Sequence, residues 1–347
     1  MTAGNEGSGT LGGETRPAGA PVSPAAGLTW GAARALEGVG LDPLDVLRAV
    51  RAALDEDFRY GPDVTSAATV AGLTLTADVV VREPGVVAGL PVALAVLDLL
   101  GGYVAVSGTA GGSEAVPGTV LAADGAGPAA SGTALVADGA RVVPGDTVLR
   151  VSGDAVAVLG AERTMLNFLT HLSGIATATR AWADAVAGTG AVVRDTRKTL
   201  PGLRALEKYA VRCGGGENHR MGLGDAALVK DNHVAAAGGV AAAVRAVRAE
   251  ARPGLAIEVE CDSVAQVREA LAAGARFILL DNMPVTELRA AVAEARGYAG
   301  VRLEASGGLR LGNAREVAET GVDFLAVGAL THSSRALDLG LDYGGTG

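Results

Sequence analysis

The chain has 347 residues, with 29 Lys or Arg against 38 Asp or Glu, a formal net charge of −9 and a pI of about 5.1. This acidic balance argues against a nucleic-acid binder, because such proteins hold phosphate backbones with basic surfaces. At ~100 to 200 residues per domain, the length indicates two domains, or one large barrel with an appendage. Although 49% of the residues are hydrophobic, no run of ~18 uninterrupted apolar residues is present to span a bilayer.

The first 27 residues have the composition of a disordered tail. Twenty of them are Gly, Ala, Pro, Ser or Thr, and such a segment buries too little apolar surface to offset the entropy lost on ordering. It also lacks the basic start and apolar run of a signal peptide, so we expect a cytoplasmic protein. Cys213 and Cys261 fit that compartment, because two such cysteines form neither a disulfide framework nor a CxxC metal site.

Residues 28–165 are expected to form an N-terminal α+β sandwich domain. Apolar and polar residues alternate at 73–81 and 147–151, which predicts strands, and helices are predicted at 43–55 and 89–100. Alternation of this kind is typical of an antiparallel sheet with one buried face.

Residues 166–335 are expected to form a catalytic (β/α) barrel, so the fold belongs to the α/β class. Short β-branched runs alternate with helical segments such as 264–273 and 284–296, which is the pattern of repeated βα units around a parallel sheet. The strands are predicted at 191–194, 226–230, 256–260, 277–281, 301–305 and 324–327. One more helix and strand can be drawn from 161–190, so we expect an incomplete barrel of about seven strands, followed by a C-terminal extension at 336–347.

Each of these predicted strands runs into a charged residue, a serine or a glycine. Active sites of (β/α) barrels are assembled at the carboxyl ends of the strands, so these positions mark the expected active-site end of the barrel. They are Asp195, Asp231, Glu260, Asp281, Ser306 and Gly328.

A phosphate site is expected where Ser306, Gly307 and Gly308 lie between a strand and the following helix. Glycines let the backbone approach an anion closely, and the amino terminus of a helix offers free N–H groups and partial positive charge. The next strand ends in a second loop of small residues that contains Gly328, and phosphate sites between the last two loops recur in barrels. The alternative is a glycine turn that only reverses the chain.

Three carboxylates are candidates for a cation or a sugar. Glu258 and Glu260 are two apart on one strand and so point to the same side, where their burial is costly unless cations or hydroxyls meet them. With Asp281 at the next strand end, they suit Mg²⁺ or sugar hydroxyls. The alternative is a salt bridge in the barrel core to a neighbouring lysine.

The lysines are gathered in one part of the chain. Only three of the 29 basic residues are lysines, and Lys198, Lys208 and Lys230 fall in one short window among several arginines. This window is a cationic island in an acidic chain. Within it, Arg204, Lys208 and Arg212 are spaced four apart, which a solvated helix face explains most simply.

The segment 214–220 reads Gly-Gly-Gly-Glu-Asn-His-Arg, a flexible loop with two cationic side chains that suits an anionic ligand. It is not a dinucleotide fingerprint, because no GxGxxG follows a strand, and the chain has no GK[ST] phosphate loop. His171 and His233 have no metal-ligand partner at useful spacing, and we interpret both as structural.

A series of segments, in this order, resembles the quinolinate phosphoribosyltransferase family, also called nicotinate-nucleotide pyrophosphorylase (carboxylating). The resemblance runs over roughly residues 41–335, and several segments are long and free of gaps. They are Glu162 to Asn167, Leu172 to Thr177, Asp195 to Arg204, Gly214 to Arg220, Leu228 to His233, Glu258 to Glu260 and Leu279 to Asn282.

The resemblance implies a pentosyltransferase that joins quinolinate to phosphoribosyl pyrophosphate and releases pyrophosphate and CO2. The product is nicotinate mononucleotide, an intermediate of NAD synthesis. It further implies that cationic side chains hold the two quinolinate carboxylates, a task to which forked guanidinium groups are suited. These side chains are Arg163, Arg197, His219, Arg220 and Lys230, and Thr196 is included among the substrate-binding residues.

The resemblance also implies roles for the remaining candidates. Lys198 is then placed for the phosphoribosyl donor or its pyrophosphate, and with Glu260 and Asp281 it makes up the catalytic set. The two acids would bind ribose hydroxyls and Mg²⁺, the latter directly or indirectly. The 5′-phosphate would lie on Ser306, Gly307, Gly308 and Gly328.

In this family the neighbouring subunit completes the active site, which implies a homodimer in which Arg163 acts in trans. Small molecules are then the expected partners, without nucleic acid or membrane. The alternatives are a related phosphoribosyltransferase for another aromatic acid and a non-catalytic phosphate-binding barrel. The first predicts lost cationic residues and the second a lost Lys198, Glu260 or Asp281, but all of these are present.

Overall fold

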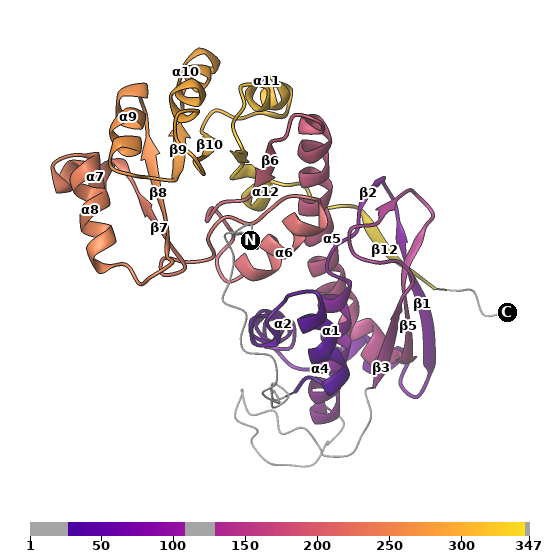
Figure 1. Cartoon of the computed structure of the whole chain (residues 1–347). Coiled ribbons are helices and arrows are strands. Elements are labelled where there is room, and N and C mark those ends of the chain that lie inside the picture. Colours follow the sequence, from indigo (N-terminus) through magenta and orange to yellow (C-terminus); the bar gives the residue numbers. More distant parts are fainter. Residues whose placement is uncertain (1–26, 108–128, 344–347) are drawn as a thin grey trace, which may run out of the picture. The chain divides into compact units, whose positions relative to one another are not determined.

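A computed structural model of the chain describes residues 27–107 and 129–343 (Figure 1). The expected disordered tail lies outside the described residues, apart from Gly27. The described residues divide into two compact units that interleave along the sequence. One comprises 181–198 and 216–329 and is called the parallel-sheet unit below. The other comprises 27–180, 199–215 and 330–343, without the undescribed residues, and is called the antiparallel-sheet unit.

The parallel-sheet unit is built on a six-stranded parallel sheet in the order β6-β11-β10-β9-β8-β7. The strands are β6 (Val192–Arg194), β7 (Ala226–Val229), β8 (Ala256–Cys261), β9 (Phe277–Asp281), β10 (Arg302–Ser306) and β11 (Phe324–Ala326). All six strands predicted between residues 191 and 327 are present, which confirms the α/β class. Because β6 and β7 are the two edges of the sheet, the barrel-like fold is incomplete, as expected.

Helices connect these strands, and Figure 1 shows α8 to α11 in a row along the sheet. In α9, Ser263 caps the amino terminus by accepting a hydrogen bond from the Gln266 N–H, and Val267 and Leu271 are buried one turn apart. The elements are α7 (Asp231–Ala237), α8 (Val240–Glu250), α9 (Val264–Ala272), α10 (Val285–Ala295), η1 (Leu311–Asn313) and α11 (Ala314–Ala318). After β11 comes α12 (Ala329–His332), which apart from Ala329 belongs to the antiparallel-sheet unit.

The seventh strand expected within 161–190 is not formed, and the estimate of about seven strands is one too high. Most of this segment belongs to one continuous helix, α5 (Ala155–Val186). Met165, Leu169 and Leu172 are buried at helical spacing along it. The helical period of these apolar residues therefore predicts the structure of the segment better than the short β-branched stretch that follows.

The antiparallel-sheet unit contains the expected α+β sandwich. Its main sheet has the order β12-β1-β5-β3, and a short pair, β2-β4, is separate. Ala77, Val79 and Val81 alternate into the core along β1. The strands are β1 (Thr74–Val81), β2 (Gly85–Val86), β3 (Ala130–Ala134), β4 (Arg141–Val142), β5 (Thr147–Asp154) and β12 (Leu339–Tyr343). The last of these lies in the segment expected as a C-terminal extension and forms an edge of the sheet.

The helices of this unit, besides most of α5 and of α12, are α1 (Trp30–Gly38), α2 (Pro43–Asp57), α3 (Val64–Thr69), α4 (Leu90–Ser107) and α6 (Arg204–Cys213). The predicted helices at 43–55 and 89–100 are thus present. Among the described residues, no helix combines the length and the apolar character that crossing a membrane requires.

The interpretation of Arg204, Lys208 and Arg212 as a solvated helix face is wrong for Lys208. This side chain is fully buried in α6, as is that of its neighbour Glu207. Spacing of four residues shows that three side chains share a face of the helix. It does not show that this face meets solvent along its whole length, and α6 packs against α2.

Candidate active site

The carboxyl ends of the parallel strands gather nearly all the predicted site residues in one unit. This edge is where (β/α) folds place their functional loops. Thr196, Arg197 and Lys198 follow β6, Lys230 follows β7, Glu260 lies in β8, Asp281 ends β9, Ser306 ends β10 before Gly307 and Gly308, and Gly328 follows β11.

His219 and Arg220 come from the segment before β7, and hydrogen bonds fasten that segment to β6. Glu217 forms a parallel bridge with Arg194, its N–H donating to the Val193 carbonyl at 2.9 Å. The Asp195 carboxylate then accepts the His219 backbone N–H at 2.9 Å. The loop therefore presents His219 and Arg220 beside the end of the first strand.

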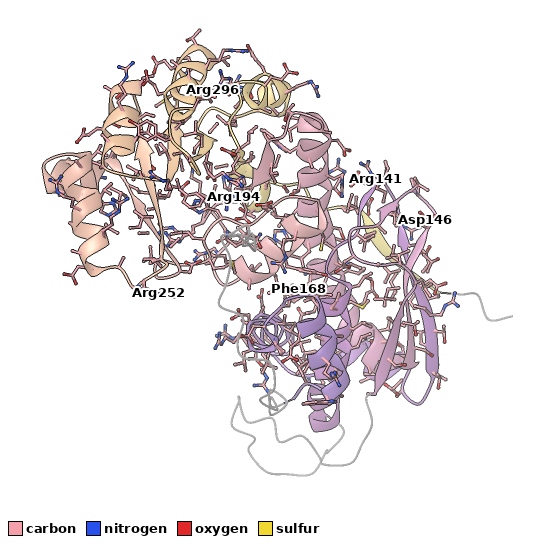
Figure 2. The ribbon with its side chains drawn as sticks, in the orientation of Figure 1. Arg141, Asp146, Phe168, Arg194, Arg252 and Arg296 are labelled. Carbon is pink, nitrogen blue, oxygen red and sulfur yellow. The ribbon has the colours of Figure 1, made fainter. Side chains whose placement is uncertain are left out.

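The His219 ring lies between two buried carboxylates. Its Nε2 is 2.5 Å from Glu258 Oε2 and 3.7 Å from Glu304 Oε1. The other oxygen of Glu304 accepts a hydrogen bond from Arg194 Nη1 at 2.8 Å. Figure 2 labels Arg194 among the side chains of this unit, and its side chain is only 2% exposed. Two acids and two basic groups thus form one buried cluster.

The electrostatics of this cluster favour a charged imidazole. Burial alone lowers the pKa of His219, but the hydrogen bond to Glu258 and the charges of both carboxylates raise it above its usual value overall. Burial and the nearby Glu258 charge raise the pKa of Glu304 to about 7. A cationic His219 suits an anionic ligand.

Two arginines lie near this histidine. Arg220 donates from Nη1 to the Ala226 carbonyl at 2.9 Å, which fixes the guanidinium. Burial and the charge of Arg197 lower the pKa of Arg220, so the two guanidinium groups are close enough to repel each other. An anion with two carboxylates would relieve that repulsion and accept forked hydrogen bonds.

The predicted acid pair lies on neighbouring strands with different partners. Glu260 Oε2 is 3.5 Å from Lys230 Nζ, so the salt bridge that was the alternative exists, although Lys230 is half exposed rather than buried. Asp281 accepts a hydrogen bond from the Asn282 side-chain amide at 2.8 Å. Both acids are partly exposed, which leaves them accessible to a ligand.

The glycine loop after β10 has a conformation that few residues adopt. Gly307 and Gly308 have φ values of 80° and 63°, and a Cβ on Gly307 would meet the Asn282 amide. Asn282 itself has a φ of 54°, and its N–H donates to the Ser306 carbonyl at 2.8 Å. Glycine is therefore needed at 307, as a closely approaching loop requires.

Arg163 is the predicted site residue that lies in the antiparallel-sheet unit. It is exposed on α5. The two histidines interpreted as structural each have a hydrogen-bond partner. His171 pairs with Glu207 at 2.9 Å, and His233 accepts the Lys230 N–H at the start of α7. Cys213 and Cys261 are free thiols.

Sequence reasoning missed the buried Arg194–Glu304 pair and the bond between Glu258 and His219. The sequence places Arg194 and Glu304 in the predicted strands 191–194 and 301–305 but gives neither of them a role. The available signal was position, because both residues lie inside strands of a parallel sheet, where a charge is costly unless it is paired.

Comparison with known proteins identifies the family. Residues 63–173 match the N-terminal domain of quinolinate phosphoribosyl transferase, and residues 175–342 match its C-terminal domain. Nicotinate-nucleotide pyrophosphorylase [carboxylating] of Mycobacterium leprae is 55% identical over 295 residues, which are 84% of this chain and 95% of that protein.

Solved structures agree with these matches. The structure of NadC from Streptococcus pyogenes is 35% identical with a TM-score of 0.75, covering 87% of this chain and 98% of that one. The nicotinate-nucleotide pyrophosphorylase from Francisella tularensis is 36% identical with a TM-score of 0.74, covering 86% and 96%. The chain described here belongs to the quinolinate phosphoribosyl transferase family.

Proposed function

We propose that this chain transfers phosphoribosyl from phosphoribosyl pyrophosphate to quinolinate with decarboxylation, and so makes nicotinate mononucleotide for NAD synthesis. The observation that carries the proposal is the convergence of His219, Arg220 and Arg197 at one edge of the parallel sheet, beside the acids Glu260 and Asp281. The names of the relatives, nicotinate-nucleotide pyrophosphorylase [carboxylating], support the same reaction.

Quinolinate carries two adjacent carboxylates, and the cationic groups fit that charge. Two buried acids raise the pKa of His219 and so favour its cationic form, while Arg197 and Arg220 offer forked donors to planar carboxylates. Lys230 adds a point charge on the rim. Thr196 and Lys198 lie on the same loop, where the Thr196 hydroxyl accepts the Lys198 backbone N–H at 3.0 Å.

We assign the phosphoribosyl donor mainly to the ends of the four central strands of the sheet, β11, β10, β9 and β8. Its 5′-phosphate lies on the backbone N–H groups of Ser306, Gly307, Gly308 and Gly328 in this proposal, and Lys198 binds the pyrophosphate. Glu260 and Asp281 supply carboxylate oxygens on adjacent strands, a donor set that Mg²⁺ prefers. When bound there, directly or through water, Mg²⁺ would offset the charge of the departing pyrophosphate.

Transfer begins as the bond from ribose C1 to the pyrophosphate oxygen breaks and the electron pair leaves with pyrophosphate. Charge develops on a sugar that resembles an oxocarbenium ion, which the carboxylates of Glu260 and Asp281 stabilise. The quinolinate nitrogen then donates its lone pair to C1. The protein contributes mainly orientation, because His219, Arg197 and Arg220 hold the ring with its nitrogen toward C1.

Decarboxylation follows from the charge that transfer creates. The ring nitrogen becomes positive, so the adjacent carbon can keep the electron pair when its carboxylate leaves as CO2, and that carbon then takes up a proton. No side chain has to act as a covalent nucleophile in this step, and we assign none.

The proposal is tested by mixing purified protein, Mg²⁺ and phosphoribosyl pyrophosphate with quinolinate in one tube and nicotinate in another. We expect nicotinate mononucleotide and an equal amount of CO2 from quinolinate alone. Product from nicotinate, or none from either acid, would move the function to another phosphoribosyl transfer or to a non-catalytic role.

We further propose a cytoplasmic homodimer in which Arg163 of the partner subunit completes each site. Exposure of Arg163 on α5 supports this, since a cationic side chain in that position is available to a second chain. The free thiols of Cys213 and Cys261 suit a reducing compartment.

Mixed dimers test the trans arrangement. Arg163→Ala and Glu260→Gln chains, each inactive alone, are unfolded and refolded together in equal amounts. If Arg163 acts in trans, a mixed dimer has one site free of both changes, and about a quarter of wild-type activity returns. If Arg163 acts within its own chain, the mixture stays as inactive as either variant.

A further inference from the structure

The buried side of the His219 loop contains a charge pair that the proposed reaction does not use. Arg194 and Glu304 are 2% and 1% exposed, and Nη1 of the arginine is 2.8 Å from Oε2 of the glutamate. Neither side chain is exposed enough to meet a substrate directly. An isolated buried ion pair is weak evidence for stability, because desolvation offsets much of the attraction. Stability alone therefore does not account for this buried pair beside the His219 loop, which points to a role in the site.

Arg194 connects several segments of the parallel-sheet unit. Its Nη2 donates to the Asn218 carbonyl, directly before His219, at 3.3 Å. Its guanidinium carbon lies 4.1 Å from the centre of the Phe324 ring on β11. Its backbone pairs with Glu217 of the loop. Arg194 thus joins the loop to its own strand β6 through its backbone, and to β10 and β11 through its side chain.

Glu304 has one oxygen on the arginine and the other toward the histidine. Oε1 is 3.7 Å from His219 Nε2 and is a buried oxygen that has no hydrogen-bond partner among the described residues. Leaving a buried acceptor unpaired costs free energy, so this arrangement is retained at some expense. Glu258, 2.5 Å from the same ring nitrogen, holds the other side. The ring is therefore confined by two acids.

We propose that Arg194 and Glu304 are positioning residues for the reaction, which hold the His219 ring and its loop in the orientation that binds an aromatic dicarboxylate. Arg194 fixes the backbone of the His219 loop, and Glu304 restricts the movement of the His219 ring. The substrate named in this inference rests on the proposed function. The positioning of the His219 ring does not depend on which substrate binds.

The kinetic test compares Glu304→Gln with Asp138→Ala. Gln keeps the shape and an acceptor for Arg194 but loses the charge beside His219. Asp138 is an acid of the antiparallel-sheet unit that accepts the Gly89 and Leu90 N–H groups, so its removal destabilises the protein without touching the His219 cluster. We expect Glu304→Gln to raise the KM for quinolinate about tenfold and the KM for phosphoribosyl pyrophosphate less than twofold, and Asp138→Ala to raise neither.

A second measurement follows the ring without relying on activity. The chain has four histidines, so the imidazole nitrogen resonances of His219 can be assigned by comparison with His219→Asn. Glu304→Gln is expected to shift them, whereas Asp138→Ala leaves them in place. Arg194→Lys, which keeps the charge but loses the fork, is the replacement if Glu304→Gln does not fold, and it should give the same shift and the same KM difference.

The outcomes separate the two proposals. If His219→Ala raises the quinolinate KM but Glu304→Gln changes neither KM nor the ring resonances, the positioning role is overturned and the function stands. If His219→Ala leaves the quinolinate KM unchanged, the assigned substrate contact fails, and the ring resonances in Glu304→Gln then decide whether the pair positions His219. Equal increases in both KM values would also overturn the positioning role.

Discussion

Asp138, a half-buried acid of the antiparallel-sheet unit, differs in its partners from the two buried acids beside His219 in the parallel-sheet unit. In the antiparallel-sheet unit, Asp138 accepts two backbone N–H groups and the Tyr209 hydroxyl. In the parallel-sheet unit, Glu258 and Glu304 meet the side chains of His219 and Arg194, and one oxygen of Glu304 has no hydrogen-bond partner within the part of the chain that the structure describes. An acid satisfied mainly by backbone donors stabilises a turn, whereas acids inside the strands that hold cationic side chains prepare a binding site.

The largest expected effect comes from breaking the buried pair. Arg194→Met leaves Glu304 uncompensated in the core, which should lower the free energy of unfolding by about 3 to 5 kcal/mol in urea titrations. Arg302→Met is the matched control, because Arg302 also lies over Phe324 but forms a half-exposed pair with Asp323. The control should cost less than about 1 kcal/mol. Equal losses of unfolding free energy in the two variants would contradict the expectation that the buried pair matters more than the exposed one.

The next effect is a dependence on pH. Burial and the Glu258 charge raise the pKa of Glu304 to about 7, so the folded state holds this proton more tightly than the unfolded chain. The stability that the proton contributes is present at low pH and is lost as pH rises through about 7. The unfolding free energy of wild type minus that of Glu304→Gln should fall by up to about 3 kcal/mol between pH 4.5 and 7. A difference that rises with pH would show that the pKa is lowered instead.

A smaller effect is expected in the antiparallel-sheet unit. Asp138→Ala leaves the Gly89 and Leu90 N–H groups and the Tyr209 hydroxyl without their acceptor, at a cost of about 1 to 3 kcal/mol. Urea titration measures the loss, and steady-state kinetics of the folded variant should give the wild-type KM values. A selective change in the quinolinate KM would assign this acid to the site as well.

The smallest effect concerns the glycine loop. Gly307→Ala brings a methyl group onto the Asn282 amide at a φ of 80°, whereas Gly308→Ala has open space at a φ of 63°. Both variants carry the strain of a left-handed residue, roughly 1 to 2 kcal/mol, and only the first adds a clash. We expect the KM for phosphoribosyl pyrophosphate to rise more for Gly307→Ala. Equal effects would mean that Asn282 simply moves away.

Much of this fold follows from local sequence pattern. Alternation along 73–81 and apolar runs such as 277–281 set the strands, and the end of each run marks the edge where site residues gather. Asp281 and Ser306 could be placed at that edge because a parallel sheet aligns its carboxyl ends. No information beyond the sequence was needed to place these two residues at the same edge.

Other features depend on tertiary packing, which local pattern does not encode. Lys208 has the spacing of a surface residue, yet its helix is buried there. The stretch after Leu172 is β-branched, yet the long helix continues through it. The Arg194–Glu304 pair joins residues 110 positions apart, so neither partner can be found without the register of the sheet.

The most direct test of the central claim is calorimetric titration of quinolinate and nicotinate into the wild-type protein and Arg220→Ala. Removing a charged donor to a carboxylate should weaken quinolinate binding at least about tenfold, with phosphoribosyl pyrophosphate binding changed less than twofold. Nicotinate should bind the wild-type protein more weakly than quinolinate by a similar factor. Equal affinity for the two acids, or equal loss for quinolinate and the donor, would contradict a dicarboxylate site at the ends of the parallel strands.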